Sequence, residues 1–286
     1  MGVTDVKVQE VYGLDYDKTF YEALHPVYGF IFLFKWMPQS QPIPTQDTAD
    51  PELFFAKQVV HDACATQAIL SVLLNNAQNI ALGTNLMQFR DFCMELDPYS
   101  RGLSIGESDF IREAHNAFGI QRAFQFSHEK SSEKEDAFHF IAYVSHNNNI
   151  IELDGLQESA KIIGSSADPT AWYQVVLEHI RKKVQTYEHR EIRFSLLAIA
   201  EDKRKVLQNK IKTLRETAAK MNGSESQGQK IMIEQEISDL ETQIETRELE
   251  IKNYTSENVR RRHNYIPLIF ALLDGAAKSG KLEKLL

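Results

Sequence analysis

The sequence predicts an α/β layered domain over residues 1–200 and an all-α helical hairpin extension over residues 201–286. Three observations support this division. The first part mixes apolar runs of strand length with segments of helix length, which is typical of layered domains. The second part carries helical periodicity only. A chain of 286 residues with 43% hydrophobic residues is also long enough for one domain of ordinary size with an appendage.

Strands and helices alternate along the first part. Residues 30–34 and 193–199 are apolar runs without the alternation of a half-exposed strand, so we expect central strands covered on both faces. Residues 64–74 and 108–118 have the length and the Ala, Leu and Glu content of helices. Asp62 is placed to cap the first of these helices. The mixture indicates a layered α/β domain.

Two heptad seams predict the helical hairpin. The first seam has apolar residues at steps of four and three, at Leu207, Ile211, Leu214, Ala218 and Met221. The second seam follows the polar breaker 222–228, is interrupted by Arg247, and consists of Ile233, Ile237, Leu240, Ile244 and Ile251. The short breaker favours an antiparallel arrangement. A charged hairpin of this kind is typical of an interaction surface, and the alternative is a hairpin packed on the first domain without a partner.

Composition restricts the compartment and the partners. No run of eighteen apolar residues occurs, and the amino terminus lacks a signal segment, so we expect a cytoplasmic and nuclear protein without a membrane partner. The two cysteines are too few for a disulfide framework. The net charge of -8 argues against a general nucleic-acid binder. The basic segment 260–263 is a local exception, better explained by a solvated helix face or an acidic partner.

Cys64 is the first candidate for chemistry. It lies in the first turn of the predicted helix 64–74. There, unpaired backbone N–H groups and the positive end of the helix dipole favour the thiolate, which is the nucleophilic form of cysteine. Taken alone, a structural role is the more common one for a cysteine, because the side chain behaves as a small buried hydrophobe. Cys93 fits that interpretation.

Two strand-like runs, residues 137–144 and 150–154, flank the polar turn 145–149. This pattern predicts a β-hairpin. If the hairpin is centred on the turn, Val144 lies opposite Asn149, and the numbers of paired residues keep a constant sum. A slip of one residue in this register would turn every side chain of one strand to the other face.

The same register places His139 directly opposite Asp154, with about 4.5–5.5 Å between their Cβ atoms. A carboxylate at this position holds an imidazole in one tautomer and stabilises its protonated form. Together with a cysteine at a helix N-terminus, the pair predicts a thiol nucleophile with its base and orienting acid. The alternative is a polar cross-strand pair at a sheet margin.

Gln58 is the candidate for the second requirement of acyl transfer, an oxyanion hole. It lies six residues before Cys64, and the intervening loop can turn its amide toward a tetrahedral oxygen beside the Cys64 backbone N–H. Taken alone, a surface glutamine is the simpler interpretation. The sequence has no His-Glu-x-x-His, Cys-x-x-Cys, phosphate-binding Gly-rich or EF-hand motif, so we expect neither a metal nor a cofactor.

These residues belong to ordered blocks that resemble the ubiquitin C-terminal hydrolases, and most of all the branch associated with the proteasome. The blocks are residues 54–58 with 63–69, residues 136–140 and residues 152–156. The resemblance covers nearly the whole chain. It implies a papain-like cysteine protease fold with a knotted backbone, which periodicity alone does not predict.

The resemblance also implies an activity. It is that of a deubiquitinating cysteine protease, which hydrolyses adducts at the C-terminal glycine of ubiquitin through a thioester. The implied catalytic residues are Cys64 as nucleophile, His139 as general base and then acid, Asp154 as orienting carboxylate and Gln58 as oxyanion donor. Two rival interpretations are a non-catalytic ubiquitin-binding scaffold and an unrelated papain-like peptidase. The intact set of four residues favours the enzyme, and Gln58 with the long hairpin favours this family.

The implied partners begin with ubiquitin, whose basic surface suits the acidic balance of this chain. Residues 257–267 resemble the region with which the proteasome branch docks on a proteasomal ubiquitin receptor and a chromatin-remodelling subunit. In the family, the segment that corresponds to residues 127–136 crosses over the catalytic cleft and limits which adducts enter. We therefore expect regulation by this loop and by the extension.

Three departures from the family pattern stand beside the resemblance. Family members usually begin with a further helix and strand, so the domain over residues 1–200 is expected to be truncated at its start. The Lys- and Glu-rich tail that members of the proteasome branch carry is not among residues 1–286. Asp62 stands where the family has Asn, which adds a negative charge near the expected thiolate.

Overall fold

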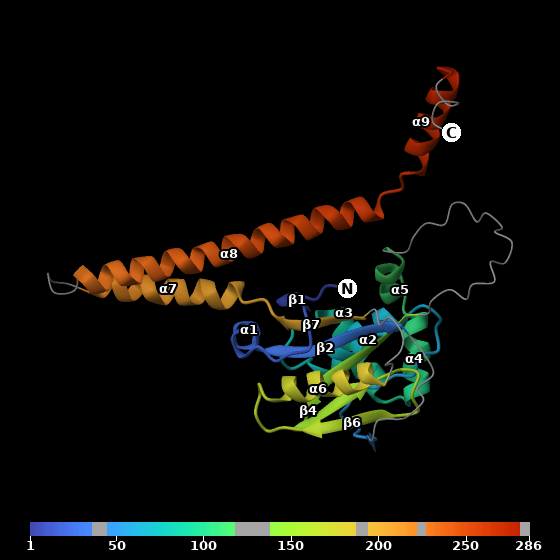
Figure 1. The fold of residues 1–286 in the computed structure, drawn as a ribbon, viewed down its shortest axis with the longest axis horizontal. Coiled ribbons are helices and arrows are strands. Elements are labelled where there is room, and N and C mark those ends of the chain that lie inside the picture. Colours follow the sequence, from blue (N-terminus) through green and yellow to red (C-terminus); the bar gives the residue numbers. More distant parts are fainter. Residues whose placement is uncertain (36–44, 118–137, 187–193, 222–226, 281–286) are drawn as a thin grey trace. The chain divides into compact units, whose positions relative to one another are not determined.

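The computed structural model describes residues 1–35, 45–117, 138–186, 194–221 and 227–280 (Figure 1). Contacts divide the chain into two compact units, taken here over their described residues. The first comprises Met1–His115 and Lys134–Lys203, and the second comprises Asn116–Glu133 and Arg204–Leu286. The domain boundary predicted between residues 200 and 201 stays a prediction. Among the described helices, none is long and apolar enough to span a bilayer.

The first unit is built on one sheet, which has seven strands in the described part of the chain. Their order is β1-β7-β2-β4-β5-β6-β3, and all neighbours are antiparallel. The strands are β1 (Val6–Val11), β2 (Val27–Lys35), β3 (Gln46–Thr48), β4 (Phe138–His146), β5 (Asn149–Leu153), β6 (Ala160–Ser165) and β7 (Phe194–Glu201). The predicted central strands are β2 and β7, which have a neighbour on each side and most of whose apolar residues are buried. This part of the prediction is confirmed.

Helices cover both faces of the sheet (Figure 1). They are α1 (Lys18–Leu24), α2 (Cys64–Asn75), α3 (Thr84–Met94), α4 (Pro98–Glu107), α5 (Asp109–Asn116) and α6 (Trp172–Gln185). Side chains of α2 to α5 fill one core with alternate residues of β4 such as Ala142. Side chains of α1 and α6 fill the other core with Ile141 and Tyr143. Successive side chains of a strand point to opposite faces of the sheet, and here helices bury the side chains on both faces. The predicted layered architecture is therefore confirmed.

The helix predicted over residues 64–74 is α2, but its predicted cap is wrong. The N-cap position is Ala63, and no side chain caps the helix. Asp62 has a φ of 61°, in the left-handed region. A residue whose side chain caps a helix occupies the N-cap position itself and has an extended backbone. Asp62 lies one residue before the N-cap position, and its backbone is left-handed instead of extended.

The register predicted for the β4–β5 hairpin, with Val144 opposite Asn149, is also wrong. His146 lies opposite Asn149. The connection is a two-residue turn at Asn147 and Asn148, whose φ angles of 50° and 61° are those of a tight hairpin turn in which both central residues are left-handed. Asparagine tolerates this conformation, so the strands extend further into the polar segment than its composition indicates.

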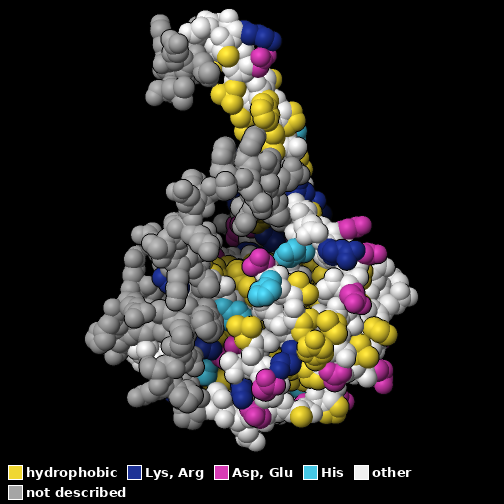
Figure 2. All heavy atoms as spheres, turned by 90° about the vertical axis from the view of Figure 1, so that its right-hand side faces the viewer, with side chains coloured by type: hydrophobic (Ala, Val, Ile, Leu, Met, Phe, Trp, Pro, Cys, Tyr) yellow, Lys and Arg dark blue, Asp and Glu magenta, His cyan; other side chains and the backbone are white. Residues whose placement is uncertain are grey.

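The second unit consists of α7 (Arg204–Lys220), α8 (Gln227–Arg262) and α9 (Ile266–Lys278). The predicted hairpin is confirmed, since α8 returns along α7 and packs against it (Figure 1). One residue from each seam, Ile211 and Leu240, is buried. Ion pairs flank this contact, with 2.7 Å between Lys210 Nζ and Glu236 Oε1. Apolar side chains stand exposed along α9 at the top of Figure 2.

Candidate active site

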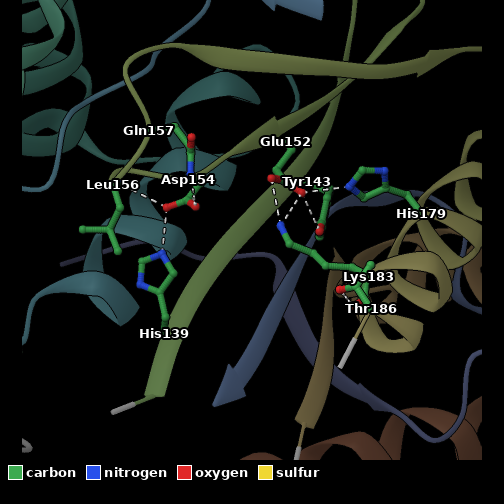
Figure 3. Close-up of polar contacts among 9 residues, drawn as sticks. All are labelled: His139, Tyr143, Glu152, Asp154, Leu156, Gln157, His179, Lys183 and Thr186. Carbon is green, nitrogen blue, oxygen red and sulfur yellow. Dashed lines mark hydrogen bonds and ion pairs between the residues drawn. The ribbon is translucent and has the colours of Figure 1, made fainter. Parts of the chain in front are cut away.

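His139 and Asp154 meet in a buried pair at one end of the β4–β5 hairpin (Figure 3). His139 Nε2 lies 2.7 Å from Asp154 Oδ1. The register differs from the prediction by two residues, which leaves both side chains on the expected face because the period of a strand is two. Since β5 ends at Leu153, Asp154 reaches His139 from the turn that follows the strand.

The carboxylate of Asp154 is held by its own turn. Its Oδ1 accepts a hydrogen bond from the backbone N–H of Leu156 at 3.0 Å, and its Oδ2 accepts one from Gln157 Nε2 at 3.4 Å (Figure 3). With the acid fixed in this way, the Nε2–H of His139 donates to it. The imidazole is therefore held in one tautomer, with Nδ1 as the nitrogen that can interact with a thiol.

Cys64 opens α2, and α2 packs on β4, which brings the thiol to His139. Burial raises the pKa of the Cys64 thiol, but the hydrogen bond with His139 and the backbone N–H groups of Phe140 and Ala65 outweigh it and lower the pKa below its ordinary value. The structure thus favours the thiolate, as the helix N-terminus predicts. Cys93 is fully buried, and burial raises its pKa to about 11.

His139 is the base of this arrangement. Burial lowers the pKa of its imidazole, but the hydrogen bonds to Asp154 and Cys64 outweigh burial and raise the pKa to about 9. A raised histidine pKa beside a lowered cysteine pKa is the signature of a thiolate–imidazolium pair. Such a pair can attack a carbonyl carbon and then deliver a proton to the leaving group.

Gln58 lies beside this site, in the segment between β3 and α2. Its backbone N–H donates to the carbonyl of Gly155 at 2.8 Å, which places it next to the Asp154 turn. Its side-chain Nε2 donates to the carbonyl of Val60 at 3.4 Å. All four predicted site residues therefore come from segments that meet at one place, and the oxyanion role of Gln58 stays a prediction.

Gly155 is a site residue that sequence reasoning missed. A Cβ atom there would lie 2.2 Å from Gln67 Nε2 and 3.0 Å from the backbone nitrogen of Gln58. Only a residue without a side chain lets the Asp154 turn approach the Gln58 segment this closely. The signal in the sequence was the glycine directly after the predicted acid.

A buried ionic cluster near the site was also missed by the sequence analysis (Figure 3). Glu152 accepts hydrogen bonds from Lys183 Nζ, at 2.9 Å to each of its oxygens, and from Tyr143 Oη at 2.9 Å. His179 Nε2 lies 3.0 Å from Glu152 Oε2. Burial raises the pKa of Glu152, but Lys183 and His179 outweigh it and hold the pKa far below its usual range.

The ionic cluster contacts the site through an aromatic ring. Lys183 Nζ lies 5.6 Å from the centre of the Phe34 ring, within the range of a cation–π contact. The Phe34 ring in turn lies 5.9 Å from the His139 ring at a steep angle. Glu152 also precedes Asp154 by two residues, so the cluster supports both members of the buried pair.

Among the described residues, one group has spacing suited to a metal ion: Asp50, Glu52 and His146, with ligand atoms within 4.8 Å of one another. His146 Nε2 already lies 3.2 Å from Asp50 Oδ2. Glu52 is exposed. The group is explained as a polar contact near the surface, and we assign it no ligand.

The comparisons with known proteins agree with this geometry. Residues 1–185 match the family model described as ubiquitin carboxyl-terminal hydrolase, family 1, and residues 237–282 match a second model described as ubiquitin carboxyl-terminal hydrolases. The chain is 35% identical over 311 residues to ubiquitin carboxyl-terminal hydrolase isozyme L5 of Dictyostelium discoideum, an alignment covering 100% of this chain and 89% of the relative. It is 42% identical over 207 residues to ubiquitin carboxyl-terminal hydrolase 2 of Schizosaccharomyces pombe, covering 71% and 68% respectively.

A solved structure extends the agreement to three dimensions. The crystal structure of Trichinella spiralis UCH37 bound to ubiquitin vinyl methyl ester matches with a TM-score of 0.67 and 30% sequence identity, over 88% of this chain and 91% of that chain. The predicted papain-like α/β fold with C-terminal helices is thereby confirmed. The knot stays a prediction, because residues 36–44 and 118–137 lie outside the described part of the chain. With a family model matched over residues 1–185, the chain belongs to family 1 of the ubiquitin carboxyl-terminal hydrolases.

Proposed function

We propose that the chain is a deubiquitinating cysteine protease that hydrolyses adducts at the C-terminal glycine of ubiquitin. The observation that carries the proposal is the alignment of Cys64, His139 and Asp154, with 2.7 Å between His139 Nε2 and Asp154 Oδ1 and a cysteine pKa lowered by the same histidine. A non-catalytic scaffold has no need of a lowered cysteine pKa.

The reaction follows from the roles of these groups. The Cys64 thiolate attacks the carbonyl carbon of the ubiquitin C-terminal glycine, and the Cys64 backbone N–H with the Gln58 amide stabilises the oxyanion. The His139 imidazolium protonates the leaving amine, which leaves a thioester on Cys64. His139, now neutral, takes a proton from water, the water attacks the thioester, and the thiolate returns. Asp154 holds the ring and stabilises its charged form throughout.

Ubiquitin is the expected partner, and the ubiquitin-bound Trichinella spiralis relative supports it. Further partners in the proposal are a proteasomal ubiquitin receptor and a chromatin-remodelling subunit, bound through the C-terminal helices. The exposed apolar side chains of α9 support a binding role for this region. A cytoplasmic and nuclear location is also proposed, and imaging of the tagged chain tests it. The regulatory loop predicted at residues 127–136 lies outside the described residues and stays a prediction.

Labelling with ubiquitin vinyl methyl ester tests the function directly. We expect one ubiquitin to be attached per chain, on Cys64, because its pKa is lowered and it is half-buried at the start of α2. Digestion and mass spectrometry locate the modified cysteine. A Cys93→Ala variant should label equally well, because Cys93 is fully buried. Labelling of Cys93, or no labelling, would contradict the assignment.

Replacement of Gln58 by Ala is expected to lower kcat by about 10²–10³-fold, with little change in KM, because an oxyanion donor acts mainly in the transition state. Hydrolysis of ubiquitin bearing a C-terminal fluorophore measures both constants. Gln174, an exposed glutamine on α6, provides the matched control, and Gln174→Ala should leave both unchanged. An effect of Gln58→Ala confined to KM would make Gln58 a substrate-binding residue.

The pH dependence of hydrolysis follows from the raised pKa of His139. We expect kcat/KM to fall as the pH rises through about 9, where the imidazolium loses its proton. The apparent value belongs to the Cys64–His139 pair, since the two groups titrate together. In Asp154→Asn, this fall in kcat/KM should occur at lower pH, because the hydrogen bond to Asp154 is the largest interaction that raises the pKa of His139. If kcat/KM of Asp154→Asn falls at the same pH as that of the unchanged protein, the role of Asp154 in raising the pKa of His139 is contradicted.

The same raised pKa has a consequence for stability. A histidine whose pKa is higher in the folded than in the unfolded state stabilises the fold in its protonated form. For His139 this contribution is complete below its ordinary pKa of 6.5 and is lost as the pH rises through about 9.

A further inference from the structure

Helix α4 lies against residues 53–58, the segment that carries Gln58. The backbone N–H of Lys57 donates to the carbonyl of Pro98, the first residue of α4, at 2.8 Å. One turn later, a Cβ atom on Gly102 would lie 2.0 Å from the carbonyl oxygen of Lys57. The helix and the segment therefore touch backbone to backbone, at the residue that directly precedes Gln58.

Arg101, next to Gly102, forms buried hydrogen bonds to the same segment. Its guanidinium is buried, with 7% of the residue exposed, and burial lowers its pKa. Nη1 donates to the carbonyls of Leu53 at 3.1 Å and Phe55 at 3.3 Å. Its other donors bind the end of α3, with 2.9 Å from Nε to the carbonyl of Cys93 and 3.0 Å from Nη2 to that of Met94. A planar group with five donors thus joins this segment to α3.

The opposite side of the segment is held by the catalytic elements. Gln67 of α2 donates from Nε2 to the carbonyl of Ala56 at 2.5 Å, and Gly155 accepts from the backbone N–H of Gln58 at 2.8 Å. The segment lies between these contacts and α4. The position of the Gln58 backbone relative to the Asp154 turn is therefore set by how closely α4 approaches.

We propose that Arg101 and Gly102 are positioning residues for the oxyanion donor, and that they affect catalysis through Gln58. The inference rests on the proposed oxyanion role of Gln58. An oxyanion donor must lie within about 2.7–3.1 Å of the developing charge, and a misplacement of about 1 Å can cost 10²-fold in rate. A side chain at position 102 has to displace a backbone carbonyl, which cannot move aside as the end of a side chain can.

A double-mutant cycle on the full chain tests the inference. Gly102→Ala is expected to lower kcat by about 10- to 10²-fold, with KM changed less than about threefold. In a Gln58→Ala background, Gly102→Ala should cause no further loss, because the group it misplaces is gone. Hydrolysis of the fluorogenic ubiquitin substrate measures all four proteins. Equal fractional losses with and without Gln58 would overturn the positioning role.

Two further variants keep the test decisive. Gly164→Ala is the matched control, because Gly164 lies on β6, away from the site, and its Cβ would lie 2.7 Å from Val175 Cγ1 of α6. For this variant kcat should stay unchanged. If Gly102→Ala does not fold, Arg101→Lys replaces it, since lysine keeps the charge but loses the fork, and the same non-additivity is expected.

The outcomes separate this inference from the function it rests on. If Gln58→Ala lowers kcat but the two losses multiply, only the positioning role is overturned. If Gln58→Ala leaves kcat unchanged, the oxyanion role is overturned together with this inference, while labelling of Cys64 still reports on the protease function by itself.

Discussion

Replacement of Asp154 by Asn is expected to lower kcat by up to about 10⁴-fold, which is the loss found when the orienting acid of a serine protease triad is replaced in this way. The reason is local. An amide can present its NH2 group to His139 Nε2, which favours the imidazole tautomer with the proton on Nδ1, the nitrogen that must interact with Cys64. The 2.7 Å bond between Nε2 and Oδ1 is therefore the interaction that fixes the tautomer of the ring.

The measurement is hydrolysis of ubiquitin bearing a C-terminal fluorophore. Cys64→Ala should abolish hydrolysis while ubiquitin binding and folding are retained, because only the attacking atom is removed. Gln157→Ala provides a milder comparison, because its bond to Asp154 is long, at 3.4 Å, and the Leu156 N–H still holds the acid. Unchanged turnover in Asp154→Asn would show that His139 does not depend on this acid.

Replacement of Lys183 by Met is expected to lower the free energy of unfolding by about 3–5 kcal/mol, the cost of leaving one partner of a buried ion pair without the other. Lys183 and Glu152 are both buried, and Nζ lies 2.9 Å from each carboxylate oxygen. Without the lysine, Glu152 keeps its bonds from Tyr143 and His179 but loses the nearest positive charge.

The neighbouring residue on α6 provides a matched control. Lys182 pairs with Glu178 at 3.0 Å, but both side chains are more than half exposed. Lys182→Met should therefore change stability by less than about 1 kcal/mol. Urea denaturation of each variant gives the comparison. Similar midpoints for Lys182→Met and Lys183→Met would show that burial of the pair has no energetic consequence.

The cluster also predicts the response to acid. The pKa of Glu152 is held far below its ordinary value of 4.5, so its contribution to stability is complete above that value and is lost as the pH falls further. Lys183→Met should reduce this loss, because the unpaired carboxyl takes up a proton more readily. Midpoints of urea denaturation measured at neutral and at acidic pH give the difference between the two proteins.

Much of the fold and the site can be predicted from local sequence. The apolar runs that become β2 and β7, and the heptad seams that become α7 and α8, follow from side-chain periodicity alone. The place of Cys64 at the start of a helix makes it a candidate nucleophile, and the predicted His139–Asp154 pair supports that role. The pairing of His139 with Asp154 is predicted even from an incorrect register, because a shift of two residues preserves the face of every side chain.

Other features depend on contacts between distant segments. The hairpin register was decided by the left-handed φ angles of Asn147 and Asn148, a conformation that composition allows but does not require. The bond between Glu152 and Lys183 joins residues 31 positions apart, on elements with no shared periodicity. Local patterns carry no information about such pairs.

The sequence by itself therefore determined several of the main elements, such as β2, β7, α2 and the hairpin of α7 and α8. Through three short blocks it also determined the family and its candidate catalytic residues. Only the tertiary structure decided how those residues are held. The close approach of α4 at Gly102, the Arg101 bonds to Leu53 and Phe55, and the ionic cluster behind His139 arise when packing brings separate segments within hydrogen-bonding distance. Hydrogen bonds act over about 3 Å in space, whereas a sequence pattern records only spacing along the chain.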